Sequence, residues 1–320
     1  MLLTIGAFDG FHRGHAELFR ICRELSSGNE WGILTFEPHP SEYLTHTAHS
    51  LFTLREKELI RRILDIPNMY ALKFDASLME LSPYEFWRMI RARFNVTGLV
   101  VGSDFRFGRK RSGNAESLKR LANNDGITNV YISPLLDKPE YSSSKVRECI
   151  TAGNVDMAGS ILGYPYFVMG SVIHGSERGR TISYPTANIA LDASRVIPAY
   201  GVYSCAVLVD GECYCGALSI GNNPTFGDIN GVRIEVHILD FSGDIYGKEL
   251  AVFLLERVRG IETFANEGAL KAQIGQDTQQ CLEIYTQAMK GTDAGKFIIR
   301  AGEIYPTITA PETINLTQRL

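Results

Sequence analysis

Apolar and polar positions alternate with two different periods along the 320-residue chain. In the first half, short apolar runs such as Leu2–Ile5, Trp31–Phe36 and Gly98–Val101 are typical of buried strands. Between them lie segments whose apolar residues recur every three or four positions, as in His15–Leu25, which is typical of amphipathic helices. Strands that alternate with helices predict a parallel sheet covered by helices.

The pattern changes after about residue 165. Short runs with strand character, from Val168–Val172 to Glu249–Leu255, are separated by turn clusters such as Gly221-Asn222-Asn223-Pro224. Regularly spaced short strands with turn residues between them predict an antiparallel barrel or sandwich. A long amphipathic helix is predicted over Glu267–Lys290, and a further strand over Phe297–Arg300.

These patterns divide the chain into two predicted domains, residues 1–160 and 161–290, with residues 291–320 as an extension without a predicted role. The boundary is placed within a helical connector, Lys145–Leu162. Ser82, just before a proline and three residues before Glu85, is predicted to cap a helix that ends near Phe94.

Composition and charge narrow the function classes. Hydrophobic residues make up 45% and charged residues 21%, which is typical of a globular protein. The longest apolar runs are far too short to span a membrane, and the start lacks the basic region of a signal peptide, so we expect a soluble cytoplasmic protein without a membrane partner.

The net charge is −4, with +2 in residues 1–150 (20 Lys and Arg, 18 Asp and Glu) and −6 in residues 151–320 (12 and 18). This balance favours a small anionic substrate over nucleic acid. The spacing of the six cysteines predicts reduced thiols rather than a zinc site or a disulfide framework.

The segment Gly6–His15 follows a predicted strand and opens a helix. Its glycines allow a close approach of the backbone to a ligand, and a helix N-terminus favours phosphate. His12 and His15 add hydrogen-bond donors in the same turn. The spacing matches neither a Walker A loop nor G-x-G-x-x-G. An alternative remains open, in which the glycines only turn the chain and the histidines cap the helix.

A second set of candidate residues lies in the predicted β domain. Taken alone, Pro185-Thr186-Ala187-Asn188 is a turn with a capping residue. Glu235 stands in an otherwise apolar strand, where it is either a general base or a structural partner of Arg233 or Lys248.

These segments resemble a known family. His12-Arg13-Gly14-His15 resembles the H-x-G-H signature of the nucleotidyltransferase superfamily, and Tyr141–Arg147 resembles its S-S-x-x-x-R turn. Five ordered motifs are similar to those of the bifunctional prokaryotic riboflavin kinase/FMN adenylyltransferase (FAD synthetase) family. The five segments are Phe8–Gly10, His12–His15, Phe36–Pro40, Val101–Gly108 and Tyr141–Arg147. The P-T-A-N turn at Pro185–Asn188 resembles the hallmark of flavokinases.

The resemblance implies a fold of class α/β plus all-β: a Rossmann-like nucleotidyltransferase domain, then a six-stranded antiparallel flavokinase barrel with a C-terminal helix. It implies that the barrel phosphorylates riboflavin to FMN and that the first domain adenylates FMN to FAD, both with ATP and Mg²⁺. It also implies roles for individual residues. In catalysis, the implied residues are Glu235 as general base of the kinase and His12, His15 and Arg147 in adenylyl transfer. The residues implied in ATP binding are Gly6, Phe8, Asp9, Gly14, Ser143, Ser144 and Thr186. The residues implied near the flavin are Asp104, Phe107, Arg259 and Phe264, and the implied Mg²⁺ ligands are Thr186 and Asn188.

One departure from the family pattern bears on the kinase. Ser183 replaces the glycine that is usual in the turn before P-T-A-N, which puts the kinase rate in doubt if that position needs a positive φ. Two alternatives follow: an enzyme that only adenylates FMN because its kinase is impaired, or a flavin-binding module without catalysis. The sequence makes no prediction of oligomeric state.

Overall fold

The chain forms two compact units in a computed structural model, Met1–Ser142 with the segment from Thr309 onward, and Ser143–Ile308. The structure describes residues 1–26, 28, 30–45, 50–134, 141–175, 184–192, 194–222 and 232–314. Ser183 and residues 223–231, on which part of the flavokinase resemblance rests, lie outside the described residues.

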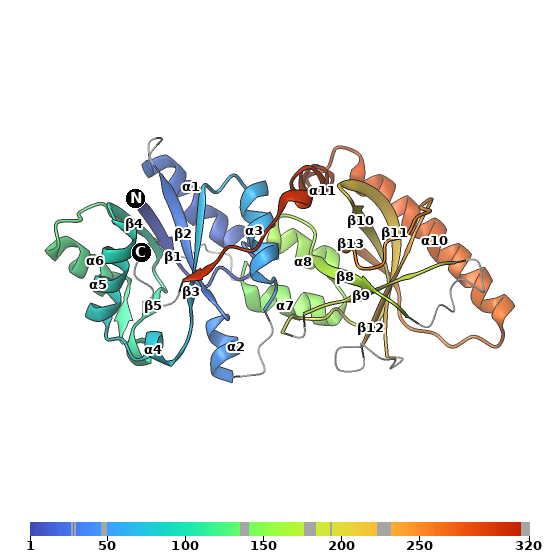
Figure 1. Cartoon of the computed structure of the whole chain (residues 1–320), viewed down its shortest axis with the longest axis horizontal. Coiled ribbons are helices and arrows are strands. Elements are labelled where there is room, and N and C mark those ends of the chain that lie inside the picture. Colours follow the sequence, from blue (N-terminus) through green and yellow to red (C-terminus); the bar gives the residue numbers. More distant parts are fainter. Residues whose placement is uncertain are drawn as a thin grey trace. The chain divides into compact units, whose positions relative to one another are not determined.

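The first unit is built on a six-stranded parallel sheet in the order β14-β3-β2-β1-β4-β7 (Figure 1). Its central strand β1 (Leu2–Ile5) is buried at every residue, as expected of a strand covered on both faces. The other strands are β2 (Trp31–Glu37), β3 (Asn68–Lys73), β4 (Gly98–Gly102), β7 (Val130–Ser133) and β14 (Thr313–Ile314). A parallel sheet with intervening helices confirms the α/β prediction for this half.

The helices of this unit begin with side-chain caps in several places. Ser82 accepts a hydrogen bond from the Glu85 amide at 3.3 Å, so the predicted cap of α5 is confirmed. The helices are α1 (Arg13–Ser26), α2 (Pro40–Thr45), α3 (Leu54–Ile63), α4 (Ala76–Met79), α5 (Pro83–Phe94) and α6 (Ala115–Asn124). A short hairpin of β5 (Arg106–Phe107) and β6 (Gly113–Asn114) flanks the 3₁₀ turn η1 (Arg109–Arg111).

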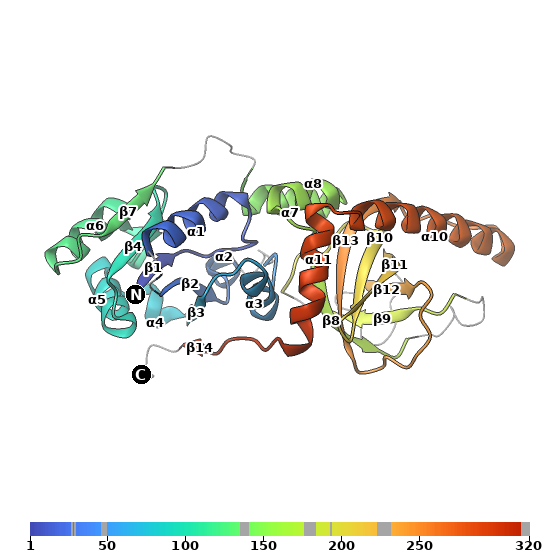
Figure 2. The same cartoon turned by 90° about the horizontal axis from the view of Figure 1, so that it is seen from above.

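The second unit is a closed antiparallel barrel of six strands in the order β10-β11-β12-β9-β8-β13. Figure 2 shows the long helix α10 (Glu267–Met289) beside β10 and β11. The predicted helical connector is confirmed as α7 (Ser143–Ala152) and α8 (Val155–Leu162). The barrel strands are β8 (Phe167–Ile173), β9 (Ala187–Ala190), β10 (Gly201–Val209), β11 (Glu212–Gly221), β12 (Arg233–Ile238) and β13 (Glu249–Arg259).

The predicted strand over Phe297–Arg300 is wrong, because these residues belong to helix α11 (Asp293–Ile304), which is followed by the 3₁₀ turn η2 (Tyr305–Thr307). Phe297, Ile298 and Ala301 are buried, which is the spacing of one helix face rather than of a strand. The Thr292 hydroxyl caps the helix by accepting from the Gly295 amide at 3.0 Å.

After α11 the chain returns to the first unit, where β14 pairs in parallel with the edge strand β3. Thr313 lies opposite Ala71 and Ile314 opposite Leu72. This short strand covers backbone groups that would otherwise be exposed at the sheet edge.

We expect a chain that ends at Ile308 to exchange the amide hydrogens of β3 about five- to thirtyfold faster, since the lost ladder bonds are worth about 1–2 kcal/mol. Hydrogen–deuterium exchange of a peptide covering Asn68–Lys73 measures this. A chain that ends at Ile314 keeps β14 and is the matched control. Equal protection of β3 in both chains would show that β14 does not stabilise this edge.

Candidate functional sites

The loop between β1 and α1 is held by buried side chains on either side of a glycine turn. Phe8 and Phe11 are 2% and 1% exposed, and their rings stack with centroids 6.3 Å apart. Their backbones, with Gly10 between them, have positive φ angles of 43°, 38° and 93°. The buried Asp9 carboxylate accepts a hydrogen bond from the Leu51 amide at 3.0 Å. The loop is therefore anchored to the core and to the segment that precedes α3.

His12 and His15 lie at the end of this loop, where α1 begins. Their rings stack with centroids 3.7 Å apart, and the His15 amide donates to the His12 carbonyl at 2.7 Å. The Gly14 amide donates to His12 Nδ1 at 3.1 Å, so the ring proton of neutral His12 is on Nε2.

Burial lowers the pKa of His12 to about 4, against a smaller opposing effect of Asp9. The pKa of His15 is also well below its usual value, because of burial and then of the neighbouring His12 and Lys57. Both imidazoles are therefore neutral at physiological pH, and each neutral ring offers one N–H donor.

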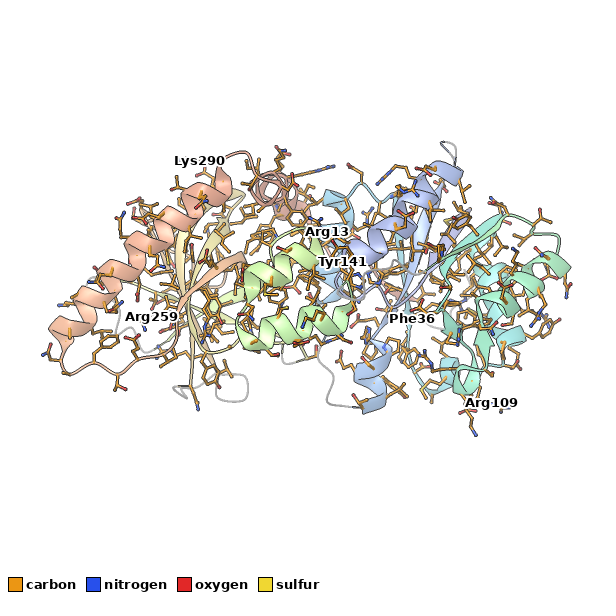
Figure 3. All side chains as sticks on the ribbon, turned by 180° about the vertical axis from the view of Figure 1, so that it is seen from behind. Arg13, Phe36, Arg109, Tyr141, Arg259 and Lys290 are labelled. Atoms are coloured by element: carbon orange, nitrogen blue, oxygen red, sulfur yellow. The ribbon has the colours of Figure 1, made fainter. Side chains whose placement is uncertain are left out.

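Gly14 is required by close packing. A Cβ atom there would lie 2.9 Å from the His12 ring and 2.9 Å from the Tyr141 carbonyl oxygen. Figure 3, in which Arg13 and Tyr141 are labelled, shows the turn that contains Gly14 next to the backbone at Tyr141. A side chain at Gly14 would displace the histidine ring.

Of the other residues in this unit that are predicted to bind ATP or flavin, some lie at the surface and others are buried in the core. Asp104 is exposed after β4, whereas Phe107 is 6% exposed and packs against Phe86 and Phe105. Phe8 and Asp9 are buried, and a Cβ at Gly6 would approach the Phe8 ring to 3.1 Å. Phe8, Asp9 and Phe107 are thus buried, and their predicted contacts with ligands stay predictions.

Ser143, Ser144 and Arg147 lie in the first two turns of α7. Ser144 is exposed, whereas Ser143 and Arg147 are half-buried. They belong to the second compact unit and the two histidines to the first, so their meeting around one nucleotide stays a prediction.

The candidate residues of the barrel meet on two neighbouring strands. Asn188 in β9 lies directly opposite Glu235 in β12, and the Thr186 hydroxyl donates to a Glu235 oxygen at 3.4 Å. Pro185 and Thr186 therefore lead directly into strand β9, where the sequence alone predicted a turn. The sequence pattern missed β9 because it is only four residues long and follows a proline.

Arg233 links two of these side chains. Its Nη2 lies 2.6 Å from Glu235 Oε1, and its Nε donates to Asn188 Oδ1 at 3.2 Å. The structural pairing of Glu235 with Arg233 that the sequence left open is thus present, whereas Lys248 pairs with Asp210. Arg233 was named from the sequence only as a possible partner of Glu235, two positions along the same strand face, and its contact with Asn188 was not predicted.

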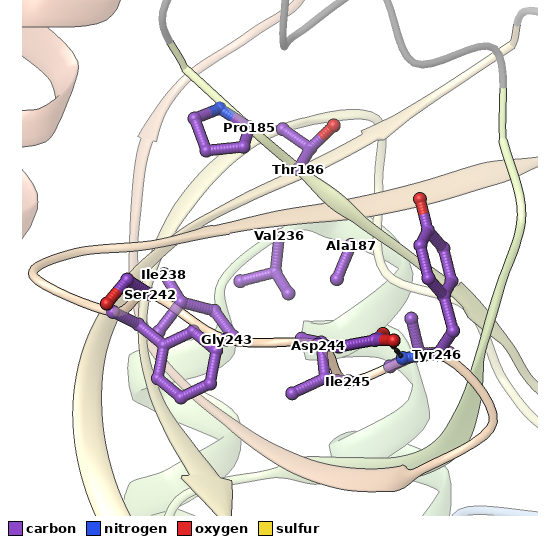
Figure 4. Close-up of a pocket in the computed structure, with 12 residues that line it drawn as sticks. Pro185, Thr186, Ala187, Val236, Ile238, Ser242, Gly243, Asp244, Ile245 and Tyr246 are labelled. Atoms are coloured by element: carbon purple, nitrogen blue, oxygen red, sulfur yellow. Dashed lines mark hydrogen bonds between the residues drawn. The ribbon is translucent and has the colours of Figure 1, made fainter.

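A cavity of about 520 Å³ opens next to Thr186. Figure 4 shows Pro185 and Thr186 on one side of it and Gly243–Tyr246 on the other. The Tyr246 amide donates to Asp244 Oδ1 at 3.0 Å, and the Tyr246 ring stacks on His174. The volume suits a ligand of nucleotide size, and the lining is mainly apolar with a few polar groups.

Arg259 and Phe264 are also brought together. The guanidinium lies 5.5 Å from the Phe264 ring centroid, which is a cation–π distance. Arg259, labelled in Figure 3, donates from Nε and Nη2 to the buried Asp277 carboxylate at 3.0 and 2.7 Å, and from Nη1 to the Gly260 carbonyl. Asp277 in α10 therefore fixes the guanidinium, and it was missed because it is distant in sequence.

All six cysteines are free thiols, as predicted. Among the residues that the structure describes, no group of three or more His, Cys, Asp or Glu side chains is arranged to bind a metal ion. Within the same residues, none of the helices has the length and apolar character needed to cross a membrane.

Comparison with known proteins gives consistent results for both halves. A family model described as FAD synthetase matches residues 1–146, and one described as riboflavin kinase matches residues 162–285. The bifunctional riboflavin kinase/FMN adenylyltransferase of Listeria monocytogenes is 35% identical over 283 residues, 87% of this chain and 90% of that protein. The protein of the same name from Escherichia coli K12 is 35% identical over 291 residues, 89% and 92% of the two chains.

A crystal structure of a protein named macrolide-efflux protein from Streptococcus pneumoniae has the same fold, with a TM-score of 0.78 and 33% identity. It covers 88% of this chain and 93% of its own. Its name indicates transport, whereas both family models that match this chain describe enzymes of flavin synthesis.

Proposed function

The chain belongs to the bifunctional riboflavin kinase/FMN adenylyltransferase family, and from that premise we propose how its two sites carry out the two reactions. We assign adenylyl transfer to a domain of residues 1–160 and phosphorylation to a domain of residues 161–290. Helix α7 then carries residues of the first reaction although it belongs to the compact unit of the barrel.

In adenylyl transfer, a phosphate oxygen of FMN attacks the α-phosphorus of ATP, and pyrophosphate leaves. Such a reaction depends on positioning and on stabilisation of charge. The neutral His12 and His15 donate hydrogen bonds to the ATP phosphates from the start of α1, where the free amides of a helix also favour anions. Ser143, Ser144 and Arg147 bind phosphate oxygens from α7, and Asp104 lies on the flavin side.

In the kinase reaction, the riboflavin 5′-hydroxyl attacks the γ-phosphorus of ATP, and ADP leaves. Glu235 accepts the hydroxyl proton as general base. The observation that carries this assignment is the meeting of Thr186, Asn188 and Glu235, since Asn188 pairs with Glu235 across β9 and β12 and the Thr186 hydroxyl donates to Glu235; Thr186 also lines the 520 Å³ cavity. Arg233 orients the Glu235 carboxylate before substrate binds. Arg259 and Phe264 flank the flavin ring.

The donor set suits Mg²⁺, the metal that we propose for both reactions. Thr186 and Asn188 supply neutral oxygens, the ligands that Mg²⁺ accepts when phosphates and water complete its shell. When bound, Mg²⁺ neutralises charge on the ATP phosphates. Thr186 and Asn188 would hold the metal, and Arg233, which donates to Asn188 Oδ1, fixes the position of this amide oxygen.

The substrates are the small molecules riboflavin, FMN and ATP. We propose a cytoplasmic protein without nucleic-acid or membrane partners, which is supported by six free thiols and a net charge of −4.

A timed chromatographic assay with riboflavin, ATP and Mg²⁺, repeated with FMN as the starting flavin, tests these assignments. We expect FMN first and FAD later from riboflavin, and FAD directly from FMN. FAD from FMN without FMN from riboflavin would indicate an impaired kinase, with Ser183 as the first position to examine. Flavin binding without conversion would leave only a binding module.

A further inference from the structure

Lys57 in α3 is a buried cation that neither reaction above uses. Its side chain is 0% exposed, and within the described part of the chain its Nζ has no hydrogen-bond partner. A buried ammonium without an opposite charge is costly, and such groups are retained mainly where they serve a site.

The acidic neighbours of Lys57 in the helix are engaged elsewhere. Glu56, 0% exposed, accepts hydrogen bonds from the Thr53 amide and hydroxyl at 2.8 and 3.1 Å in the cap of α3. Glu58, 6% exposed, accepts from Arg61 and Arg62 at 2.6 and 2.9 Å. Both neighbouring glutamates therefore accept from other donors, and neither forms a hydrogen bond with Lys57.

Lys57 is close to the histidine pair. The Asp9–Leu51 hydrogen bond ties the segment before α3 to the loop of His12 and His15. The charge of Lys57 is near enough to contribute to the low pKa of His15, after burial and His12. His15 Nδ1 is likewise buried without a partner among the described residues. A positive charge thus lies near His15, which stacks on His12.

We propose that Lys57 is a positioning residue for adenylyl transfer, whose ammonium provides the fixed positive charge that draws the ATP phosphates, and the departing pyrophosphate, onto the His12–His15 pair. Because Nζ has no exposure to solvent, Lys57 acts through its field and through His15 rather than by touching the nucleotide. This inference rests on the proposed ATP site in the Gly6–His15 loop.

The test compares Lys57→Met and Lys57→Arg in both reactions of the full chain. We expect Lys57→Met to raise the KM for ATP in FMN adenylylation, and for inorganic pyrophosphate in the reverse reaction, by roughly tenfold, as a lost unit charge several ångströms away predicts. Riboflavin phosphorylation by the same molecules, which uses the barrel, stays unchanged, and thermal unfolding of the variant reports whether the unit that contains Lys57 is folded. Lys57→Arg keeps the charge and restores most of the affinity.

A pH profile separates this role from packing. The groups that act on His15 are His12 and Lys57, and Asp9 acts on His12. Without the Lys57 charge, His15 takes up a proton at higher pH, so the acidic limb of kcat/KM for adenylylation shifts to higher pH. Lys73→Met, which changes an exposed lysine of the same unit, should leave the acidic limb of kcat/KM and the KM for ATP unchanged.

Two results would overturn the inference: an unchanged KM and acidic limb in Lys57→Met, or equal losses in the Met and Arg variants, which would indicate packing alone. A His12→Asn variant with full adenylylation would instead overturn the ATP site itself. A strong loss in His12→Asn with none in Lys57→Met would overturn only the role of Lys57.

Discussion

Glu235→Gln is expected to slow riboflavin phosphorylation by about 10²–10⁴-fold, the usual contribution of a general base. Glutamine keeps the size and hydrogen-bonding shape of the side chain but cannot accept the proton of the 5′-hydroxyl. The loss falls on kcat, because Thr186 and Asn188, which we expect near the phosphates of ATP, are retained. Timed chromatography of FMN formed from riboflavin measures the effect.

Two controls accompany this variant. Adenylylation of supplied FMN by the same protein should keep its rate, since it uses the other site. Glu256→Gln changes an exposed glutamate of β13 and should leave both reactions unchanged. A Glu235→Gln enzyme with normal kinase turnover would restrict Glu235 to its ion pair with Arg233 and refute its role as base.

His12→Asn is expected to lower FMN adenylylation by about 10²–10³-fold, as removal of one preorganised donor at a charged transition state does elsewhere. Asparagine offers an oxygen that accepts from the Gly14 amide as His12 Nδ1 does, so the turn is preserved. The Nε2 donor, however, is lost. FAD formed from FMN and ATP, quantified at saturating concentrations, measures the change.

Phosphorylation of riboflavin is the internal control for His12→Asn and should be unaffected. Thermal unfolding of the variant checks that the buried stack of His12 on His15 has not opened. Full adenylylation by a folded variant would favour the alternative in which the histidines only begin α1.

Long, strongly periodic segments were predictable from the sequence. The parallel sheet, helices α1, α5 and α10, and most barrel strands follow from apolar spacing, because burial of one face requires that spacing. Helix α11 and strands β9 and β14 did not follow. Each is short or has an apolar pattern that fits both a helix and a strand, so its secondary structure depends on the surface against which it packs.

Candidate residues were predictable where they stand close together in one motif, as His12, Gly14 and His15 do. Asp277, Lys57 and the contact of Arg233 with Asn188 were missed, because they depend on partners in other elements or on the lack of one. Nothing in the local sequence distinguishes the buried Lys57 from a surface lysine, since both neighbouring glutamates could have paired with it.

By itself, the sequence determined the two-part architecture and the motifs of both reactions, because periodicity and turn residues act over a few positions. Only the tertiary structure decided that P-T-A-N enters a barrel strand opposite Glu235 and that Arg233 joins them. It also decided that the chain returns as β14 to the sheet of the first unit. The physical reason is the same in each case: strand pairing and charge burial depend on groups that are distant in sequence, and their energies exist only once the chain has folded.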